Sequence, residues 1–364
     1  MESFVIPTDN PIESLWNRIS FLASVEYVKD FLRKRFPCID ESAIVEKDQG
    51  LAFCIKSAKD YFLHGGSNIT SVSVNYYYGC FALIGAMMII SDSDVTLDNL
   101  ESYSVKGHGF SNFHESKKFP DSEFLVIRDQ GFFYEYLRCV LKLDEKLKAI
   151  CVGSEEIRKY KKGKKDLVKK RVYLKDLFSR IPELYGSYME TFGEPPKVIK
   201  APTISKRDTE RYIEFRLRID MEGRQDELID LVLEIFPEVR GFDRKIDVRG
   251  RRITFKINEE VSKHLEHGQY YRSPISDHYA FLPLLDSITD PLFFHASLLY
   301  LLSVFARYRP AVWRKLLEGR NDKFLPLVMD YLSLCRRILP NIFLDQCYQK
   351  NFRLMMTGAL VCEL

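Results

Sequence analysis

The chain has 364 residues, of which 46% are hydrophobic and 13% aromatic, a composition typical of a globular protein and not of a disordered one. The net charge is only +3, so affinity for nucleic acid has to come from a local basic patch. Eight cysteines lie scattered without a CxxC pair, which argues against zinc and favours buried thiols in a reducing cytoplasm. The first residues lack the basic and apolar regions of a secretory signal, so we expect a cytoplasmic protein. We also expect neither a metal nor a cofactor.

The first part of the chain is predicted to be helical. Apolar residues recur at helical spacing over residues 11–36, and a second helix is expected over 41–63. Residues 72–90 form the longest apolar run, and a helix that is apolar all round has to be enclosed by other elements. The run is nearly long enough to span a membrane, but polar residues before it, small residues within it and two aspartates after it favour a core helix. We therefore expect no membrane partner.

The next segment mixes turns, strands and helices. Two glycines flank His108, a pattern typical of a tight turn with backbone angles that glycine adopts easily. Residues 124–127 are predicted to form a strand, whereas residues 132–143 fit both helical and strand spacing. Residues 174–192 carry an apolar helical stripe, in which Pro182 begins or kinks a helix.

A change of pattern follows the proline-rich connector at residues 193–202. Alternation of apolar and polar side chains predicts strands, and one helical pattern lies between the first strand and the second. The expected strands are 213–219, 245–248 and 252–257, and the expected helix is 228–236. This β-α-β-β order indicates a small α+β module with an antiparallel sheet.

The last third returns to helix. Residues 292–306 are almost wholly apolar and follow Asp290-Pro291, a good start for a helix. A helix is expected around residues 312–317, and two more, 325–339 and 342–354, are expected on either side of Pro340.

These elements predict a mainly α fold in which a helical bundle body, formed by the N- and C-terminal parts, carries a small inserted α+β module. The helices 72–90 and 292–306 should pack together, because neither can bury its apolar surface alone. The expected parts are an N-terminal helical part, a basic loop with a connecting helix, the α+β module and a C-terminal helical part. Their residues are 1–150, 151–200, 201–260 and 261–364.

Several short motifs resemble the YaaC-like proteins, a bacterial family without an established activity. The motifs near the N-terminus are Trp16 with Phe21-Leu22-Ala23, Tyr61-Phe62, Tyr76-Tyr77-Tyr78-Gly79 and His108-Gly109. Those near the C-terminus are the segment 307–313, RYRPAVW, and Leu339-Pro340. The resemblance covers the first 110 residues and about the last 75, and the RYxPxxW pattern is its most specific part.

A looser likeness connects the tyrosine-rich helix with the HEPN superfamily of helical domains. Many HEPN proteins are ribonucleases that use an arginine and a histidine separated by four to six residues. Arg272 and His278 match that spacing, but Pro274 interrupts it, so a continuous helix is not expected there. The likeness implies an N-terminal HEPN-like part and, as an alternative function, a metal-independent ribonuclease.

The basic run at residues 158–171 holds nine basic residues and one acid. Such a run is commonly a solvated, mobile loop, but it also suits a polyanion, because phosphate contacts release counterions. An acidic protein or a lipid surface is a third alternative. The candidate nucleic-acid-binding residues are Arg158, Lys159, Lys161, Lys162, Lys164, Lys165, Lys169, Lys170 and Arg171.

Two further groups are open to both a chemical and a structural interpretation. Arg307, Arg309 and Trp313 suit either a phosphate with a stacked base or a structural role. In the structural case, a partner is expected among the nearby acidic residues Asp277, Asp286 and Asp290. His108 suits either a catalytic base or a turn that its side chain fixes by hydrogen bonding.

The interpretation that follows is a non-catalytic binding protein. It engages DNA or RNA, or a protein partner bound to them, through the basic central region, and the HEPN likeness places it in bacterial antiviral defence. The alternative is the HEPN-like ribonuclease, with His108 or the pair of Arg272 and His278 as the catalytic candidates. An oligomer is compatible with either function.

Overall fold

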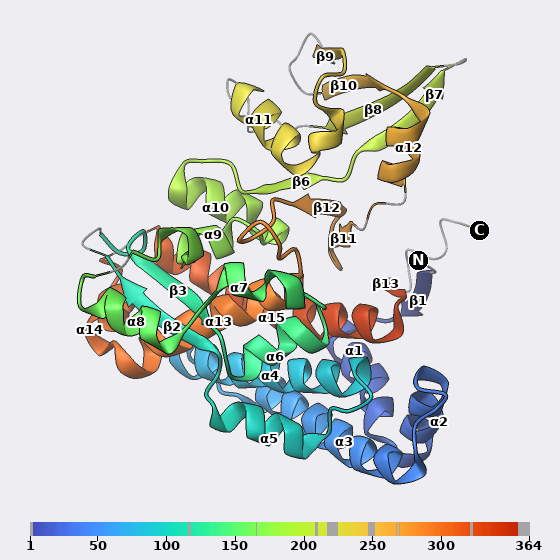
Figure 1. The fold of residues 1–364 in the computed structure, drawn as a ribbon, viewed down its shortest axis with the longest axis vertical. Helices are drawn as coiled ribbons and strands as arrows, with labels where there is room; N and C mark the ends of the chain where they lie inside the picture. The colour runs from blue at the N-terminus through green and yellow to red at the C-terminus, as the bar shows by residue number, and fades with distance from the viewer. Residues whose placement is uncertain are drawn as a thin grey trace. The chain divides into compact units, whose positions relative to one another are not determined.

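The computed structural model describes residues 3–115, 118–164, 166–207, 210–216, 225–246, 252–266, 268, 270–320 and 323–355. Most of these residues are helical, which confirms the mainly α class (Figure 1). The chain divides into two compact units. The larger unit holds the residues up to Leu177 together with those from Asp290 onward, and the smaller runs from Phe178 to Thr289. The part limits expected at residues 150, 200 and 260 stay predictions.

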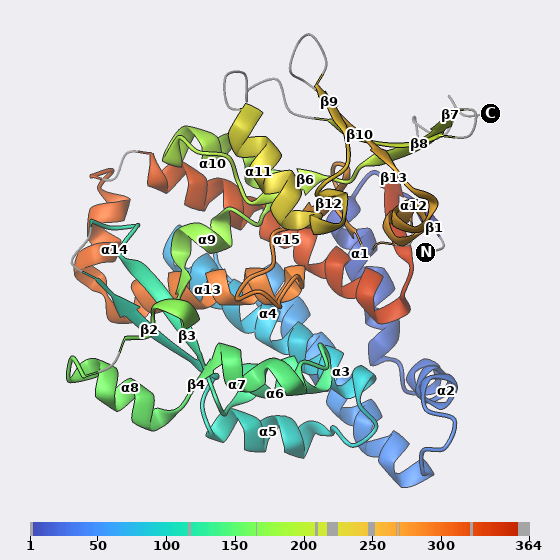
Figure 2. The same ribbon diagram turned by 45° about the horizontal axis from the view of Figure 1, so that its top comes forward.

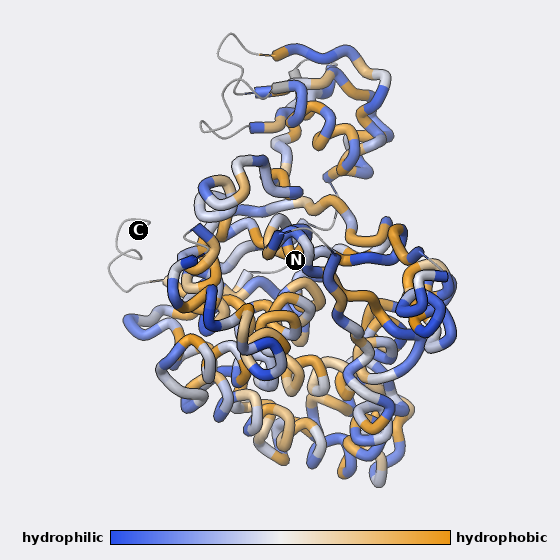
Figure 3. The backbone as a smooth tube through the Cα atoms, turned by 90° about the vertical axis from the view of Figure 1, so that its left-hand side faces the viewer, coloured by the Kyte–Doolittle hydropathy of each residue, from blue (hydrophilic) through white to orange (hydrophobic). Residues whose placement is uncertain are grey.

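Helix α4, Ile69–Ser91, is the centre of the larger unit. Helices α3, α13 and α15 pack on it, so that most side chains of its second half are buried, as its apolar sequence predicts. Their bounds are Glu41–His64, Pro291–Tyr308 and Phe324–Tyr348. Gly79 permits the close approach of α3, because a Cβ at this position would lie 2.7 Å from the ring of Phe62. Figure 3, coloured by hydropathy, shows orange, hydrophobic stretches along the backbone.

Helices α4 and α13 are also long and apolar enough to cross a membrane by length and composition alone. In the protein, 72% and 78% of their apolar windows are buried. Full burial of one such side chain stabilises a fold by about 1.5–3 kcal/mol. Burial of this extent is typical of core helices.

A buried lysine closes the C-terminal end of α4. Lys47 of α3 is fully buried, and its Nζ donates hydrogen bonds of 2.7–2.8 Å to the carbonyl oxygens of Ile89, Asp92 and Val95. These carbonyls belong to the end of α4 and to the turn that leads into α5, Leu97–Val105. One side chain thus replaces the partners that the end of a helix lacks.

The ends of the described chain pair with each other. Strand β1, Ser3–Pro7, lies parallel to β13, Asn351–Met355. The prediction of a helix over residues 342–354 is therefore wrong for its last part. Gln349 has a left-handed φ of 53°, which ends the helix, and the residues after it find a strand partner near the N-terminus.

Pro340 does not separate two helices. It lies inside the continuous helix α15, although proline removes one helical hydrogen bond. Leu339, Ile342 and Phe343 around it are buried, so packing on both sides of the proline holds the helix together. Near the N-terminus the expected helix over 11–36 is broken instead, since α1 is Pro11–Ser20 and α2 is Val25–Arg35.

A small sheet covers one side of the larger unit and carries the candidate site. Its central strand β3 pairs antiparallel with β2 and β5 and parallel with β4. The strands are β2, Phe110–His114; β3, Glu123–Arg128; β4, Cys151–Val152; and β5, Val172–Tyr173. The predicted strand 124–127 is confirmed, and the ambiguous segment 132–143 begins with a helix, α6, Phe132–Cys139.

The other short helices of the larger unit connect these elements. They are η1, Phe21–Ala23; η2, Asp144–Lys146; α7, Leu147–Ile150; α8, Ser154–Lys161; η3, Val168–Lys170; and α14, Pro310–Leu317. Helix α9, Leu174–Phe178, follows β5.

The smaller unit contains a four-stranded antiparallel sheet in the order β7-β8-β10-β9. Alternate side chains of β8 and β10 form its core with residues of α11 and α12, which therefore cover the same face (Figure 2). The bounds are β7, Thr203–Arg207; β8, Glu210–Arg216; α11, Gln225–Ile235; β9, Arg244–Ile246; β10, Arg252–Ile257; and α12, Glu259–Glu266. The first strand, β7, has no counterpart in the sequence prediction. Residues 217–219 and 247–248 of the expected strands lie outside the described residues.

The remaining elements of the smaller unit precede and follow this sheet. A short sheet in the order β11-β12-β6 lies beside two helices. The bounds are η4, Pro182–Leu184; α10, Tyr185–Phe192; β6, Val198–Lys200; η6, Pro237–Val239; β11, Tyr271–Arg272; and β12, His278–Phe281. Pro182 begins a helical turn, as the sequence predicts.

Candidate anion-binding site

The basic run is not simply a loop, because its first residues belong to helix α8. Acidic residues occupy the first turn of α8 and basic residues the last, the order that the helix dipole favours. Glu156 accepts a hydrogen bond of 3.0 Å from the backbone N–H of Gly153 and so closes the N-terminus. Residues 158–161 of the run therefore lie on a capped helix, which carries Arg158 and Lys161, whereas the choice between a solvated run and a polyanion site stays a prediction.

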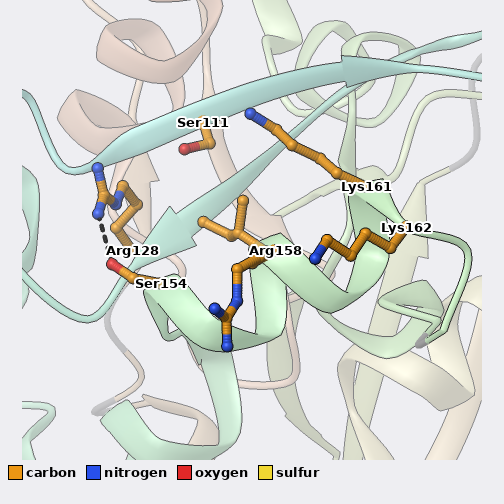
Figure 4. Close-up of a pocket in the computed structure, with 7 residues that line it drawn as sticks. Ser111, Arg128, Ser154, Arg158, Lys161 and Lys162 are labelled. Atoms are coloured by element: carbon orange, nitrogen blue, oxygen red, sulfur yellow. Dashed lines mark hydrogen bonds between the residues drawn. The ribbon is translucent and has the colours of Figure 1, made fainter.

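These two residues and Lys162 line a cavity of about 470 Å³ between α8 and the strands β2 and β3. Arg128, at the end of β3, lines the same cavity from the opposite side (Figure 4). Ser111 of β2 and Ser154 of α8 add two hydroxyl groups. The cavity with these lining residues is called the basic pocket below.

The charged residues that line the basic pocket are all positive. Two guanidinium groups and two ammonium groups line it, whereas none of the described residues that line it carries a carboxylate. Arg128 is held in place by a hydrogen bond of 2.8 Å from its Nη2 to the Oγ of Ser154. Its Nε is buried and makes no hydrogen bond in the described part of the chain. An anion in the pocket would meet cations and hydroxyl donors from three elements.

Two of the nine candidate residues have structural roles instead. Arg171 pairs with Glu115 and Asp166, and only 9% of its side chain is exposed. The Nζ of Lys170 donates to the carbonyl oxygen of Cys151 at 2.5 Å. Both side chains are thus already engaged inside the protein.

Three further candidates, Lys159, Lys164 and Lys169, do not line the basic pocket. Lys159 points to Glu155 on the same helix, with which it forms an ion pair of 2.8 Å. Lys164 and Lys169 are exposed. Lys165 lies outside the described residues.

The RYRP segment makes contacts across the larger unit. Arg309 forms an ion pair with Glu123 of β3, and the indole Nε1 of Trp313 donates to Thr70 Oγ1 at 2.8 Å. The prediction that Asp277, Asp286 or Asp290 would be the acidic partner was wrong, because Arg309 pairs with Glu123. Asp290 instead caps α13 and accepts hydrogen bonds from Tyr136 and from Gln346.

His108 lies in a cluster of aromatic side chains next to Arg307. Its Nδ1 is 2.7 Å from the hydroxyl of the buried Tyr77. Burial and the nearby charge of Arg307 lower the pKa of His108, so that its ring is neutral at pH 7. Because a buried hydroxyl needs an acceptor, Tyr77 donates to Nδ1, and the proton of the ring lies on Nε2. In this arrangement the Nε2–H of His108 is a hydrogen-bond donor.

The glycines beside His108 have the backbone angles that the sequence predicts. Gly107 has a φ of 98° and Gly109 a φ of 88°. A side chain at Gly109 would also come within 3.0 Å of the backbone of Phe133. The turn therefore fixes the place of His108.

Arg272 and His278 are neighbours in space, but not on a helix. They are paired residues of the antiparallel strands β11 and β12 in the smaller unit. The arrangement expected of a HEPN motif, with both residues on one helix, is therefore absent for this pair.

Sequence reasoning missed Arg128. It ends a strand that was predicted only for its apolar residues, and it lies thirty positions before the basic run. Only the pairing of β3 with β4 brings it beside α8. No sequence signal marks that proximity.

The structure is that of a mainly α protein with a basic pocket. The family model described as YaaC-like Protein matches residues 20–347, and the chain belongs to this family. No curated protein and no solved structure matches the chain.

Proposed function

We propose that this protein is a non-catalytic binding protein that engages nucleic acid, or a protein partner bound to nucleic acid, through the basic pocket. The observation that carries the proposal is the convergence of Arg128, Arg158, Lys161 and Lys162 on one cavity without a lining carboxylate. The proposal includes the architecture expected from the sequence, in which a helical bundle body carries an inserted α+β module. A cytoplasmic location and a place in bacterial antiviral defence, the latter from the HEPN likeness alone, belong to the proposal too.

Phosphate is the chemistry that the pocket fits best. Guanidinium groups bind phosphate oxygens through paired hydrogen bonds, and lysines add charge without geometric demands. Each phosphate that the protein neutralises releases counterions, which supplies affinity without reading sequence. The two serine hydroxyls add donors to a sugar–phosphate backbone. The site therefore suits backbone recognition more than base recognition.

Charge reversal in the pocket is the test. Replacement of Arg158, Lys161 and Lys162 by glutamate should weaken binding of a short duplex by about a hundredfold and lower the salt slope by about 3, since each lost phosphate contact contributes about 0.9. Fluorescence anisotropy across a salt series measures both quantities. Stability should hardly change, because exposed substitutions usually stay within about 0.5 kcal/mol.

A second triple variant controls for net charge. Lys34, Lys56 and Lys146 are exposed and lie outside the basic pocket, so their replacement by glutamate changes the net charge equally. This control should bind the duplex within about threefold of the wild type, an effect of long-range charge alone. Equal losses in the two triple variants would reject the pocket as the binding site.

A metal-independent ribonuclease is the second candidate function. The observation that favours it is that His108 lies within the electrostatic influence of Arg307, an imidazole and a guanidinium from distant parts of the chain. Two features weigh against it: the neutral ring is no strong acid, and the contact with Tyr77 occupies the Nδ1 that a base would need.

Labelled RNA separates the two functions. From the binding proposal we expect intact RNA after incubation, with or without a chelator. The ribonuclease predicts cleavage that persists in the chelator and falls by at least about 10²-fold in His108→Gln, the usual contribution of a general acid or base. Tyr77→Phe is the matched control for packing in the cluster, because it keeps the ring and removes the hydroxyl. Gel analysis of the products decides between these outcomes.

A further inference from the structure

A second cavity, of about 390 Å³, lies in the larger unit among α3, α4 and α5. Three sets of residues at helical spacing line it, one from each helix, and Phe132 of α6 closes it. We call it the aromatic groove. The walls on α3 are Phe53, Ser57 and Tyr61, and the floor on α4 is Tyr78, Phe81, Ala82 and Gly85.

The aromatic groove leaves large apolar side chains exposed. Phe53 is 58% exposed and Tyr61 is 37% exposed, although both face a cavity that Phe81 and Leu100 line with further apolar surface. Exposed apolar patches of this kind mark binding sites on soluble proteins. The volume falls in the range of about 300–1,000 Å³ that is typical of pockets for small organic molecules.

A cation lies beside the groove, in contact with its lining residue Tyr78, although Arg307 itself is not a lining residue. The Nη1 of Arg307 donates to the hydroxyl of Tyr78 at 2.9 Å, and the guanidinium carbon is 5.5 Å from the centre of the Tyr78 ring. In the part of the chain that the structure describes, Arg307 forms no ion pair with a carboxylate. His108 is not a lining residue either, but its ring is in edge contact with that of Phe81, which does line the groove, at 5.4 Å between centroids.

From this juxtaposition we infer that the aromatic groove binds a small organic anion with a planar aromatic body and one acidic headgroup. The aromatic body packs against Phe53, Tyr61 and Phe81. The headgroup, a carboxylate, phosphate or sulfonate, lies beside Tyr78, where the neighbouring Arg307 supplies a charge.

Charge complementarity selects this ligand over a neutral one. Among the described residues Arg307 has no carboxylate partner, so a bound anion would not have to displace one in order to pair with it. The only acidic residue among the described residues of the lining is Glu101, on α5, and it disfavours a second acidic group along the body. A ligand with a single acidic end therefore fits best. The inference is independent of nucleic-acid binding at the basic pocket.

A matched pair of fluorescent probes tests the inference. 8-Anilinonaphthalene-1-sulfonate carries an aromatic body with one sulfonate, and N-phenyl-1-naphthylamine is the same body without a charge. We expect the sulfonate to bind with one-to-one stoichiometry and at least about tenfold more tightly than the neutral probe, the value of one charge-assisted contact. Equal affinity of the two probes would overturn the role of Arg307.

Variants locate the site. Ala82→Trp and Ser57→Trp fill the groove from its floor and from one wall, and each should abolish binding of both probes. Arg307→Met should lower affinity for the sulfonate about tenfold while sparing the neutral probe, and Arg307→Lys should restore most of it. Undiminished binding in both filling variants, each with a wild-type melting curve, would reject the groove.

Two controls exclude other sites. Val105→Trp adds the same indole at a position on α5 that is 82% exposed and does not line the groove. This variant should bind the probes like the wild type. The triple glutamate variant of the basic pocket should also bind the sulfonate normally, whereas a loss there would assign the anion to the basic pocket and overturn the inference.

Discussion

Replacement of Arg309 by methionine is expected to lower the free energy of unfolding of the larger unit by about 3–5 kcal/mol, the usual cost of removing one partner of a buried ion pair. The pair joins the residue between α13 and α14 to β3, and only 2% of the Glu123 side chain and 22% of the Arg309 side chain are exposed. Without the guanidinium, Glu123 keeps one hydrogen bond, from Ser122, and a charge that burial disfavours.

Tryptophan fluorescence during denaturation measures this loss. The chain has two tryptophans, Trp16 and Trp313, and both belong to the larger unit, so the signal reports the unfolding of that unit. Arg314→Met is the matched control, because Arg314 on the helix that follows Arg309 forms an exposed ion pair with Glu318. The control should change stability by less than about 1 kcal/mol.

The double variant with Arg309→Met and Glu123→Gln separates the pair from its surroundings. Removal of the charge on Glu123 relieves the unpaired carboxylate, so the double variant should be more stable than Arg309→Met alone. If the single variant is as stable as the wild type, Arg309 has no structural role and becomes available for binding.

The sequence predicts the helices of the larger unit well, because their apolar periodicity depends on nearby residues. The bounds of α3, α4 and α13 agree with the expected helices to within a few residues. The asparagine and aspartate caps explain where α4 and α13 begin. Pro340 misled the prediction, because a proline inside a helix costs less than the packing that holds both halves of α15 in place.

Features that depend on distant pairing were not predictable. Strand β13 forms only because β1 lies beside it, and Arg128 reaches the basic pocket only through the sheet. The basic run illustrates the same limit within one segment. Its composition indicates a polyanion site, but only the fold separates Lys161, which lines the pocket, from Arg171, which forms internal ion pairs.

The second large effect is expected at Lys47. Replacement of this residue by methionine should destabilise the larger unit by about 3 kcal/mol, because the buried carbonyl oxygens of Ile89, Asp92 and Val95 lose their donor at the same time. Methionine has a similar length and keeps most of the packing, so the loss reports hydrogen bonding and not a cavity.

Lys56→Met is the control for this experiment, since Lys56 is exposed on the same helix. We expect its melting curve to match that of the wild type within about 0.5 kcal/mol. A Lys47→Met protein as stable as this control would show that water takes over the three carbonyls.

The pH dependence of stability gives an independent test of the buried ammonium group. Burial lowers the pKa of Lys47 to about 8, against the opposing effect of Asp92 and Asp94. Between pH 8 and the higher pKa of the unfolded chain, the unfolded state binds more protons than the folded one, so stability from this group rises with pH. The wild type should therefore gain stability relative to Lys47→Met as the pH is raised from 7.5 to 9.5. Denaturation curves at several pH values measure the difference, and a constant difference would place the pKa of Lys47 at its ordinary value.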